Sequence, residues 1–273
     1  MRAWRVALLG FAACGLFPDV ASLSGSHAGD AAVEDVVVLD APQETSEEAA
    51  VDAPSDASDA SVSPCASQHL FCDDFDQTAL GALWDEKVLK SGPLALSSTS
   101  VVTPPNALEA TAITNGSGDE TALGKHFPAA DHTHVEFDLL VVSPSDTSGT
   151  ELDVADLVLD TPPSGYDYAD FDLQRWQGAT QLEEYMQGAD GGPNGGQDLP
   201  VTETFASWRH VALDLDFPNQ TFSLALDGAS VTSFAMSPAA PKCGFSLYVG
   251  VGYVEGANDD WNVFVDDVVV DQQ

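Results

Sequence analysis

Apolar and polar residues alternate along many segments of this 273-residue chain, and the alternation limits what the chain can fold into. A period of two sends successive side chains to opposite faces of a β-strand, whereas an amphipathic helix has a period of ~3.6. No segment combines a sustained helical period with capping residues. The clearest alternating segments are 133–142, 166–176, 208–216, 221–227 and 244–254, with 107–113 and 121–127 as shorter candidates.

Turn-forming residues separate these segments, for example the Pro-Pro-Asn and Pro-Pro-Ser-Gly runs at 104–106 and 162–165. We expect the Gly-rich stretch 188–197 to be a loop. Many short strands without helices predict an antiparallel β-sandwich or a β-barrel. Because the pattern extends over residues 65–273, the sequence predicts a single all-β domain there.

The first residues have the features of an export signal. Arg2 and Arg5 precede the short apolar run 6–15, which is typical of a secretory signal peptide. Residues 11–14, Phe-Ala-Ala-Cys, resemble the lipobox of bacterial lipoproteins, in which the Cys is acylated. We therefore interpret 1–17 as a signal region with Cys14 as the lipidation site, and expect an extracytoplasmic protein anchored to the cell envelope. The alternative is a secreted protein cleaved after Ala21 or Ala28.

Residues 18–64 form an acidic segment of Asp, Glu, Ala, Ser, Val and Pro that cannot bury enough apolar surface to fold, so we predict a disordered tether. The whole chain has 44 acidic and 8 basic residues, a net charge of −36. Nucleic acids and anionic membrane surfaces are recognised by basic patches. The composition thus argues against both as partners, and leaves the lipid as the expected membrane contact.

Three cysteines follow Cys14 in the sequence, namely Cys65, Cys72 and Cys243. In an oxidising compartment this number predicts one disulfide and one remaining thiol. Cys65–Cys72 is the local pairing, but the sequence leaves a pairing of Cys243 with either of them open. The spacings match no zinc site.

Several motifs between residues 70 and 273 resemble the concanavalin A-like lectin/glucanase superfamily, including its laminin-G-like members. The resemblance rests on the order and spacing of "FCDDFD" before Trp84, "PPNALEA" at 104–110, the 208–228 segment, "VGVGY" at 249–253 and a closing "WNVFVDDV". It implies a jelly roll of two antiparallel sheets, in which the first and last strands are neighbours. The two Asp-Asp strands would then lie side by side.

That pairing would bring together four carboxylates, from Asp73, Asp74, Asp266 and Asp267. Like charges on adjacent strands repel each other, and Ca²⁺ accepts several oxygen ligands in flexible geometry. Because several relatives of this fold carry a structural Ca²⁺ near the first and last strands, we consider a Ca²⁺ site here. The alternative is that the four acids lie on a solvated face.

Residues 151–160 carry acids in a pattern that suggests chemistry. Laminarinase- and lichenase-type glycoside hydrolases of this fold have Glu-x-Asp-x-x-Glu on a bulged strand. A bulge at Ala155 would turn Leu152, Val154, Leu157 and Leu159 inward and the acids outward. By this resemblance Glu151 would be the nucleophile, Asp153 its helper and Asp156 the acid/base of a retaining hydrolase. Asp156 departs from the pattern, because the family has the longer Glu there.

The neighbouring segments predict glycan contact without catalysis. Alternation in 166–176 and 180–186 places Ala169, Phe171, Leu173, Leu182 and Met186 inward. Aromatic rings stack on sugar faces and carboxylates accept bonds from hydroxyls. We therefore predict non-catalytic carbohydrate binding. The alternatives are the hydrolase and a structural surface module whose aromatic residues are covered by the Gly-rich loop. The predicted binding face consists of Tyr166, Tyr168, Asp170, Asp172, Trp176 and Tyr185.

Overall fold

The computed structural model describes residues 63–76, 79–113, 119–142, 151–176, 179–189, 192, 194–202, 204–255 and 260–273. The predicted signal region, Cys14 and nearly all of the predicted tether lie outside the described residues. Within the described part of the chain, no helix is long and apolar enough to cross a membrane.

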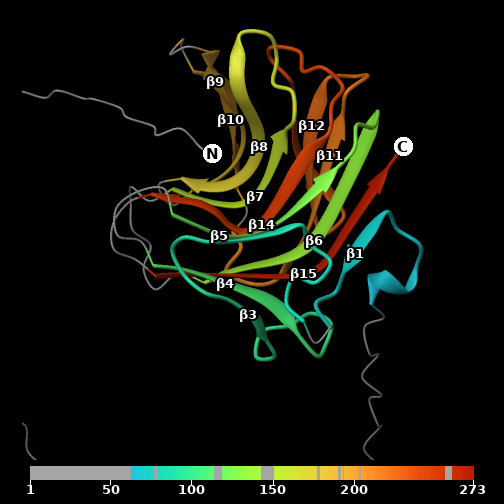
Figure 1. Cartoon of the computed structure of the whole chain (residues 1–273), viewed down its shortest axis with the longest axis vertical. Coiled ribbons are helices and arrows are strands. Elements are labelled where there is room, and N and C mark those ends of the chain that lie inside the picture. Colours follow the sequence, from blue (N-terminus) through green and yellow to red (C-terminus); the bar gives the residue numbers. More distant parts are fainter. Residues whose placement is uncertain are drawn as a thin grey trace, which may run out of the picture. The chain divides into compact units, whose positions relative to one another are not determined.

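The fold is an antiparallel β-sandwich of two sheets (Figure 1). The eight-stranded sheet has the order β13-β12-β11-β6-β15-β4-β3, with β1 pairing with β15. Its strands are β1 (Phe71–Asp73), β3 (Leu94–Ser97), β4 (Ala107–Ile113), β6 (His132–Val142), β11 (Arg209–Asp216), β12 (Thr221–Leu226), β13 (Ala229–Ala235) and β15 (Asp260–Gln272).

The seven-stranded sheet has the order β10-β9-β8-β7-β14-β5-β2. A short 3₁₀ helix, η1 (Pro64–Ala66), precedes β1. The predicted strands are present, including the short ones at β4 and β5. The strands of this sheet are β2 (Glu86–Leu89), β5 (Asp119–Phe127), β7 (Glu151–Leu159), β8 (Tyr166–Trp176), β9 (Ala179–Gly188), β10 (Gly195–Val201) and β14 (Phe245–Glu255).

The core lies between the two sheets and is built from the apolar half of each alternating strand. On β6 every second residue from Thr133 to Val141 is buried, and the residues between them are partly exposed. Ala169, Phe171 and Leu173 of β8 and Leu182 and Met186 of β9 are fully buried in this core, as predicted. The alternation therefore sets which face of each strand is turned away from the core.

One strand lies where we expected only loop. β10 begins at Gly195, inside the Gly-rich stretch, and pairs with β9 at the edge of the sheet. Pro200 sits opposite Gln181 in this ladder. Proline has no N–H to donate and is tolerated in a strand at a sheet edge, so neither Pro200 nor the glycines prevent pairing here.

The first and last strands pair as predicted, with Phe71 opposite Val270 and Asp73 opposite Val268. The Asp-Asp step of β15 coincides with a break in its register with β6, between Asp266 and Val269. Asp267 has a φ of 54° there, a left-handed conformation that Asp adopts more readily than most residues. A disulfide joins Cys65 to Cys72, and Cys243 is a buried free thiol.

Candidate ligand-binding face on the seven-stranded sheet

A bulge in β7 decides which acidic side chains share the outer face of the seven-stranded sheet. The register between β7 and β8 shifts between Asp153 and Ala155, where the sequence predicted a bulge. Because the extra residue restores the alternation, two acids separated by three positions, Asp153 and Asp156, both turn away from the core. The inward residues are buried in the core cluster as expected: Leu152, Val154, Leu157 and Leu159.

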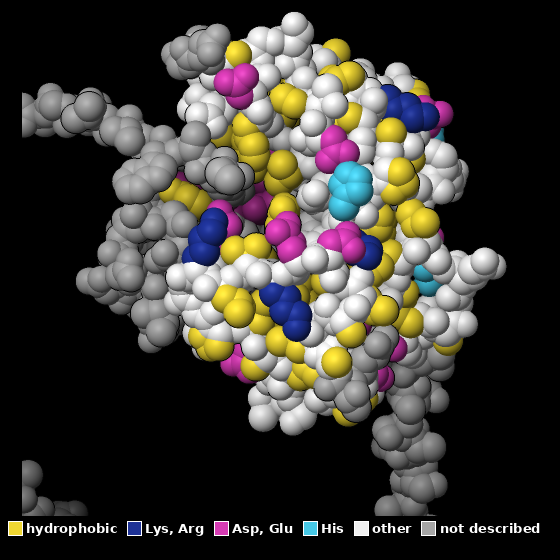
Figure 2. All heavy atoms as spheres, in the orientation of Figure 1, with side chains coloured by type: hydrophobic (Ala, Val, Ile, Leu, Met, Phe, Trp, Pro, Cys, Tyr) yellow, Lys and Arg dark blue, Asp and Glu magenta, His cyan; other side chains and the backbone are white. Residues whose placement is uncertain are grey.

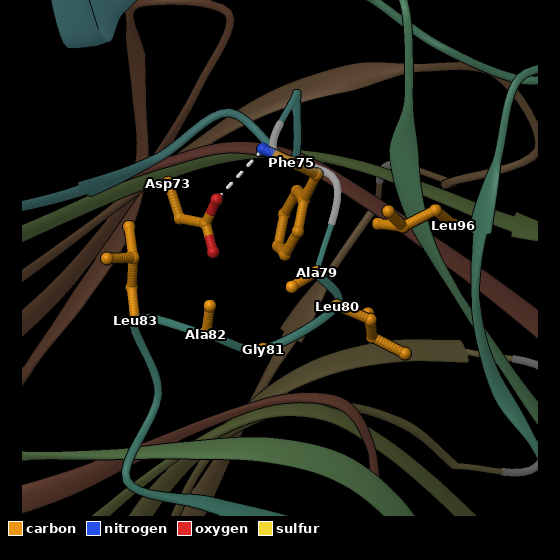
Figure 3. Close-up of a pocket in the computed structure, with 8 residues that line it drawn as sticks. All are labelled: Asp73, Phe75, Ala79, Leu80, Gly81, Ala82, Leu83 and Leu96. Atoms are coloured by element: carbon orange, nitrogen blue, oxygen red, sulfur yellow. Dashed lines mark hydrogen bonds between the residues drawn. The ribbon is translucent and has the colours of Figure 1, made fainter.

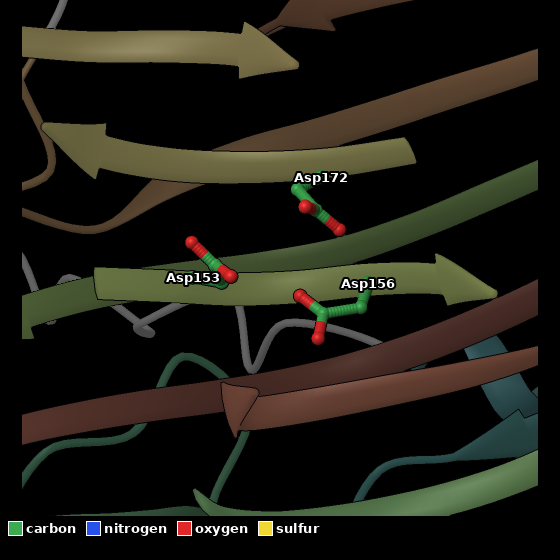
Figure 4. Close-up of side chains that lie close together, drawn as sticks. All are labelled: Asp153, Asp156 and Asp172. Atoms are coloured by element: carbon green, nitrogen blue, oxygen red, sulfur yellow. The ribbon is translucent and has the colours of Figure 1, made fainter. Parts of the chain in front are cut away.

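Three carboxylates meet at this bulge. Asp153 and Asp156 of β7 and Asp172 of β8 each place an oxygen within 4.8 Å of the others. Asp172 stands directly opposite Asp156 in the ladder between the two strands. Figure 4 shows the three side chains close together across the two strands. Asp153 and Asp172 are fully buried and Asp156 is 2% exposed, so this acidic triad lies at the floor of the face.

A glycine on β14 makes room for the triad. A β-carbon at Gly252 would lie 2.2 Å from Oδ2 of Asp156, closer than such atoms approach. The "VGVGY" segment of β14 also contains Gly250, whose φ of 118° belongs to the region that favours glycine. Tyr253, next in the chain, stands opposite Asp153. Gly250 therefore allows the backbone conformation of this segment, and Gly252 leaves space for the carboxylate of Asp156.

A buried amide borders the triad. Gln174 lies opposite Asp153 across the β7–β8 ladder and two residues from Asp172 along β8, so it shares the outer face with both. Its side chain is 4% exposed. Its Nε2 donates to Oε2 of Glu183 on β9 (2.5 Å). Its Oε1 is buried and accepts no hydrogen bond from any residue that the structure describes.

Two tyrosines rise beside this floor. The rings of Tyr168 on β8 and Tyr185 on β9 have centroids 6.2 Å apart, and both side chains are half-buried. The Tyr168 hydroxyl donates to Oδ2 of Asp170 (2.5 Å), and the Tyr185 hydroxyl accepts from Nδ2 of Asn194 (3.1 Å). Asp170 itself is 1% exposed. Two residues of the predicted binding face, Tyr168 and Tyr185, are therefore neighbours, and the buried Asp170 accepts a hydrogen bond from Tyr168.

The placement of Tyr166 differs from the prediction. The register between β8 and β9 shifts between Tyr166 and Tyr168, which inserts Asp167 as an extra residue. Tyr166 consequently packs against the core cluster, and a β-carbon at Gly195 would lie 2.8 Å from its hydroxyl oxygen. Tyr166 does not belong to the outer face, because the bulge reverses the alternation at the start of β8.

Trp176 lies in the ladder opposite Glu151 and Ala179, but its side chain is outside the described residues. Glu151 is buried, yet it is not a member of the group with oxygens within 4.8 Å. The third carboxylate of that group is Asp172 of the neighbouring strand β8 and not Glu151. The structure thus gathers Asp153 and Asp156 as the hydrolase pattern implied, but with a different partner.

The aspartates of the first and last strands have protein partners. Asp73 accepts from the Phe75 N–H (2.9 Å) and from Nε1 of Trp84 (2.7 Å). Figure 3 shows its carboxylate between Phe75 and the 79–83 loop. Asp74 accepts from Oγ of Ser63 (2.6 Å). Burial raises the pKa of Asp73, and the bond from Trp84 opposes this shift.

The two aspartates of β15 hold the loop before β4. Oδ2 of Asp266 accepts from the backbone N–H groups of Val102 and Thr103, and Asp267 accepts from the Thr103 hydroxyl (2.8 Å). Burial raises the pKa of Asp266 to about 7 and that of Asp267 to about 6. Among the described residues, Asp73, Asp74, Asp266 and Asp267 supply no group of three with oxygens within 4.8 Å. A Ca²⁺ site at these four residues stays a prediction.

Sequence reasoning did not assign three contributors to the outer face. Gln174 follows the alternation of 166–176 on the side opposite Leu173, but nothing in the sequence shows that it faces Asp153. Gly252 matters only because Asp156 lies against it. Tyr248, opposite Asp156 on β14, donates from its hydroxyl to Oε1 of Glu86 on β2 (2.5 Å), and burial raises its pKa. The repeated glycines of "VGVGY" were the one visible signal.

No known family model matches the chain, and no curated protein matches its sequence. Among solved structures, that of "Cellulose induced protein, Cip1" has a TM-score of 0.55 at 12% identity, covering 74% of this chain and 97% of that one. The likeness to the PL7 alginate lyase AlyA1 from Zobellia galactanivorans has a TM-score of 0.45 at 15% identity, covering 63% and 79%.

The binding domain of botulinum neurotoxin DC, solved with SialylT, gives a TM-score of 0.46 at 7% identity over 69% of this chain and 43% of that one. Together with the strand order of the two sheets, the likeness to Cip1 shows the fold: the described domain is a concanavalin A-like jelly-roll sandwich.

Proposed function

We propose that the protein binds a carbohydrate on the outer face of its seven-stranded sheet, without catalysis. The observation that carries this proposal is the pair of half-buried tyrosine rings, Tyr168 and Tyr185, above a polar floor. Rings held 6.2 Å apart by neighbouring strands offer apolar surface to the faces of sugar rings. Gln181 and Glu183 of β9, which are also half-buried, supply hydrogen-bond acceptors and donors on the same face.

The buried acids are assigned a supporting role in this proposal. Asp170 and Asp172 are 1% and 0% exposed, so we assign them no direct contact with the ligand, and Asp170 orients Tyr168 instead. The hydrogen bond from Tyr168 to Asp170 fixes the ring of Tyr168 in this way. Preorganised rings lose little conformational entropy on binding, which improves affinity.

The charge of the protein favours a neutral ligand. With a net charge of −36, the chain repels polyanions over the screening distance of ~8 Å at physiological ionic strength. In the view of Figure 2, acidic side chains stand among hydrophobic ones and basic side chains are few. We therefore expect a neutral polysaccharide to bind more tightly than an anionic one of similar length.

The test is affinity electrophoresis in gels containing cellulose derivatives, β-glucans, xylan or alginate. Cellulose is included because Cip1 is a cellulose-induced protein, and alginate serves as the anionic comparison. We expect a neutral polysaccharide to retard the protein and the Tyr168→Ala and Tyr185→Ala variants to run freely. His132→Ala, which removes an exposed ring from the other sheet, is the matched control and should stay retarded. Equal retardation of all variants would refute this binding face.

One observation favours a second candidate, glycoside hydrolysis. The bulge of β7 places Asp153 and Asp156 on one face with oxygens within 4.8 Å, and retaining hydrolases need two carboxyl groups ~5–5.5 Å apart. Release of reducing sugar from any polysaccharide of the panel, lost in Asp156→Asn and Glu151→Gln, would favour the hydrolase. Binding without release would leave the non-catalytic function.

A further inference from the structure

Three carboxylates lie close together on the outer face of the seven-stranded sheet, and a buried amide, that of Gln174, stands beside them in the β7–β8 ladder. Asp153, Asp156 and Asp172 offer oxygens within 4.8 Å of one another. Buried carboxylates at this spacing repel unless a proton or a cation is shared among them. All the candidate ligand atoms are hard oxygens, and no sulfur or imidazole belongs to the group.

The amide of Gln174 provides evidence that does not depend on the acids. Its Nε2 is directed to Glu183 on β9, on the side of the amide away from β7. Its Oε1 is buried, accepts no hydrogen bond within the described residues, and belongs to a side chain flanked by Asp153 across the ladder and Asp172 along the strand. A buried carbonyl oxygen without a donor is destabilising unless something supplies positive charge to it.

From these contacts we infer that the floor of this face binds a divalent cation, with Asp153, Asp156, Asp172 and Oε1 of Gln174 as ligands. Ca²⁺ is the ion that the site fits best. It takes six to eight oxygens at ~2.3–2.6 Å, so that its ligands lie at most ~5 Å apart, and it accepts bidentate carboxylates and amide carbonyls. Mg²⁺ requires a tighter octahedron and retains water molecules.

The basic side chains of the described domain make several contacts outside the triad. Lys90, Lys125 and Lys242 pair with Glu120, Asp85 and Asp131, and Arg209 pairs with Asp227. Lys87 donates to the Leu80 carbonyl, and Arg175 lies 5.4 Å from the ring centre of Trp261.

Asp156 lies so close to Gly252 that a substitution of this glycine should disturb the site while every proposed ligand residue is kept. A β-carbon at position 252 would overlap the carboxylate of Asp156. Gly252→Ala must therefore push that carboxylate out of the triad. The φ of Gly252 lies outside the positive region, so alanine is compatible with its backbone. We expect this variant to fold and to bind the cation poorly.

The experiment is isothermal titration calorimetry of the whole, chelator-treated protein with CaCl₂ and with MgCl₂. We expect saturable Ca²⁺ binding that is tighter than Mg²⁺ binding. Asp172→Asn and Gly252→Ala should each weaken it by at least the ~10–100-fold that the loss of a supporting residue costs at metal sites. Asp131→Asn, an exposed acid near the other sheet, is the matched control. Asp267→Asn reports separately on any second ion at the first and last strands.

No saturable Ca²⁺ binding, or binding unchanged in both Asp172→Asn and Gly252→Ala, would overturn the site. If Asp172→Asn fails to fold by circular dichroism, Gly252→Ala and Gln174→Leu decide the outcome. The result is independent of the carbohydrate proposal, because the titration contains no sugar. Polysaccharide binding that persists in chelator and still needs Tyr168 would leave the proposed function standing without the ion.

Discussion

Replacing Trp84 by Phe removes a hydrogen bond to Asp73 of the first Asp-Asp motif and reduces the size of a buried ring. The indole Nε1 donates to Oδ2 of Asp73 at 2.7 Å, and both side chains are buried. The indole also contacts Phe71 edge-on, with ring centres 5.1 Å apart, and stacks with Phe75 at 6.4 Å. Phenylalanine keeps an aromatic ring in this cluster but cannot donate. The variant therefore removes the donor together with part of the packing of the indole ring.

The expected loss follows from the charge of the acceptor. Hydrogen bonds to charged groups contribute ~1.5–3 kcal/mol, and a buried carboxylate that loses its donor pays a desolvation penalty. We expect Trp84→Phe to lower the free energy of unfolding by about 2 kcal/mol, or the melting temperature by about 4–8 °C for a domain of this size. Urea unfolding followed by circular dichroism measures the loss directly.

The pH dependence of this loss has a defined sign. The pKa of Asp73 is raised in the folded state, so its ionisation costs stability as the pH rises from the usual range of Asp through the raised value. Removal of the Trp84 bond raises that pKa further. The difference in unfolding free energy between the wild type and Trp84→Phe should therefore increase from pH 4 to pH 7.

A double-mutant cycle with Asp73→Asn separates the bond from packing, because the coupling energy isolates the Trp84–Asp73 pair. A loss below about 0.5 kcal/mol, or a loss that does not depend on pH, would refute the reasoning.

Two further predictions concern charged groups. His134 lies between Asp214 and Glu136, and its hydrogen bond to Asp214 is the main cause that raises its pKa to about 9. The stabilisation by its positive charge is fully present below pH 6.5 and is lost as the pH rises through 9. Because the side chain is 39% exposed, we expect His134→Gln to lower the unfolding free energy by less than about 1 kcal/mol at pH 6 and not at all at pH 10. Unfolding curves at low salt measure both values. Burial raises the folded pKa of Asp267 to about 6, so its ionised carboxylate lowers the stability of the fold at neutral pH. Asp267→Asn should therefore raise the unfolding free energy in chelator by about 1–3 kcal/mol at pH 7.5. A thermal melt in which added Ca²⁺ stabilises the wild type but not this variant would support an ion at the first and last strands, and a variant less stable than the wild type in chelator would contradict the electrostatic account.

Much of the fold followed from local patterns. Alternation placed Phe171 and Leu173 in the core, and the clash between alternation and acidity in 151–160 located the bulge of β7. The pairing of the first and last strands followed from the family resemblance. These features depend on residues near one another in sequence, or on an order of motifs that a related fold already shows.

The remaining features depend on register between strands, which local patterns do not encode. Asp172 joins Asp153 and Asp156 because β8 pairs with β7 in one register, and a shift by one residue would turn it into the core. Tyr166 does not lie on the predicted face because β8 has a bulge at Asp167, and no turn-forming residue in the sequence indicates this bulge. For Asp73 and Asp266 the sequence suggested a Ca²⁺ site or a solvated face, and it did not indicate the hydrogen bonds that they accept from Trp84 and from the 102–103 loop.

The last two strands of the chain occupy the middle of both sheets. β14 lies between β7 and β5, and β15 lies between β6 and β4 (Figure 1). Neither sheet can therefore be completed until residues 245–272 have been synthesised. Until then, the edges of β4, β5, β6 and β7 that face β14 and β15 have no strand to pair with. Contacts between distant segments of this kind slow folding. A ribosome-bound chain truncated before β14 should stay sensitive to protease over its whole length, and the domain should acquire resistance in a single step after its release.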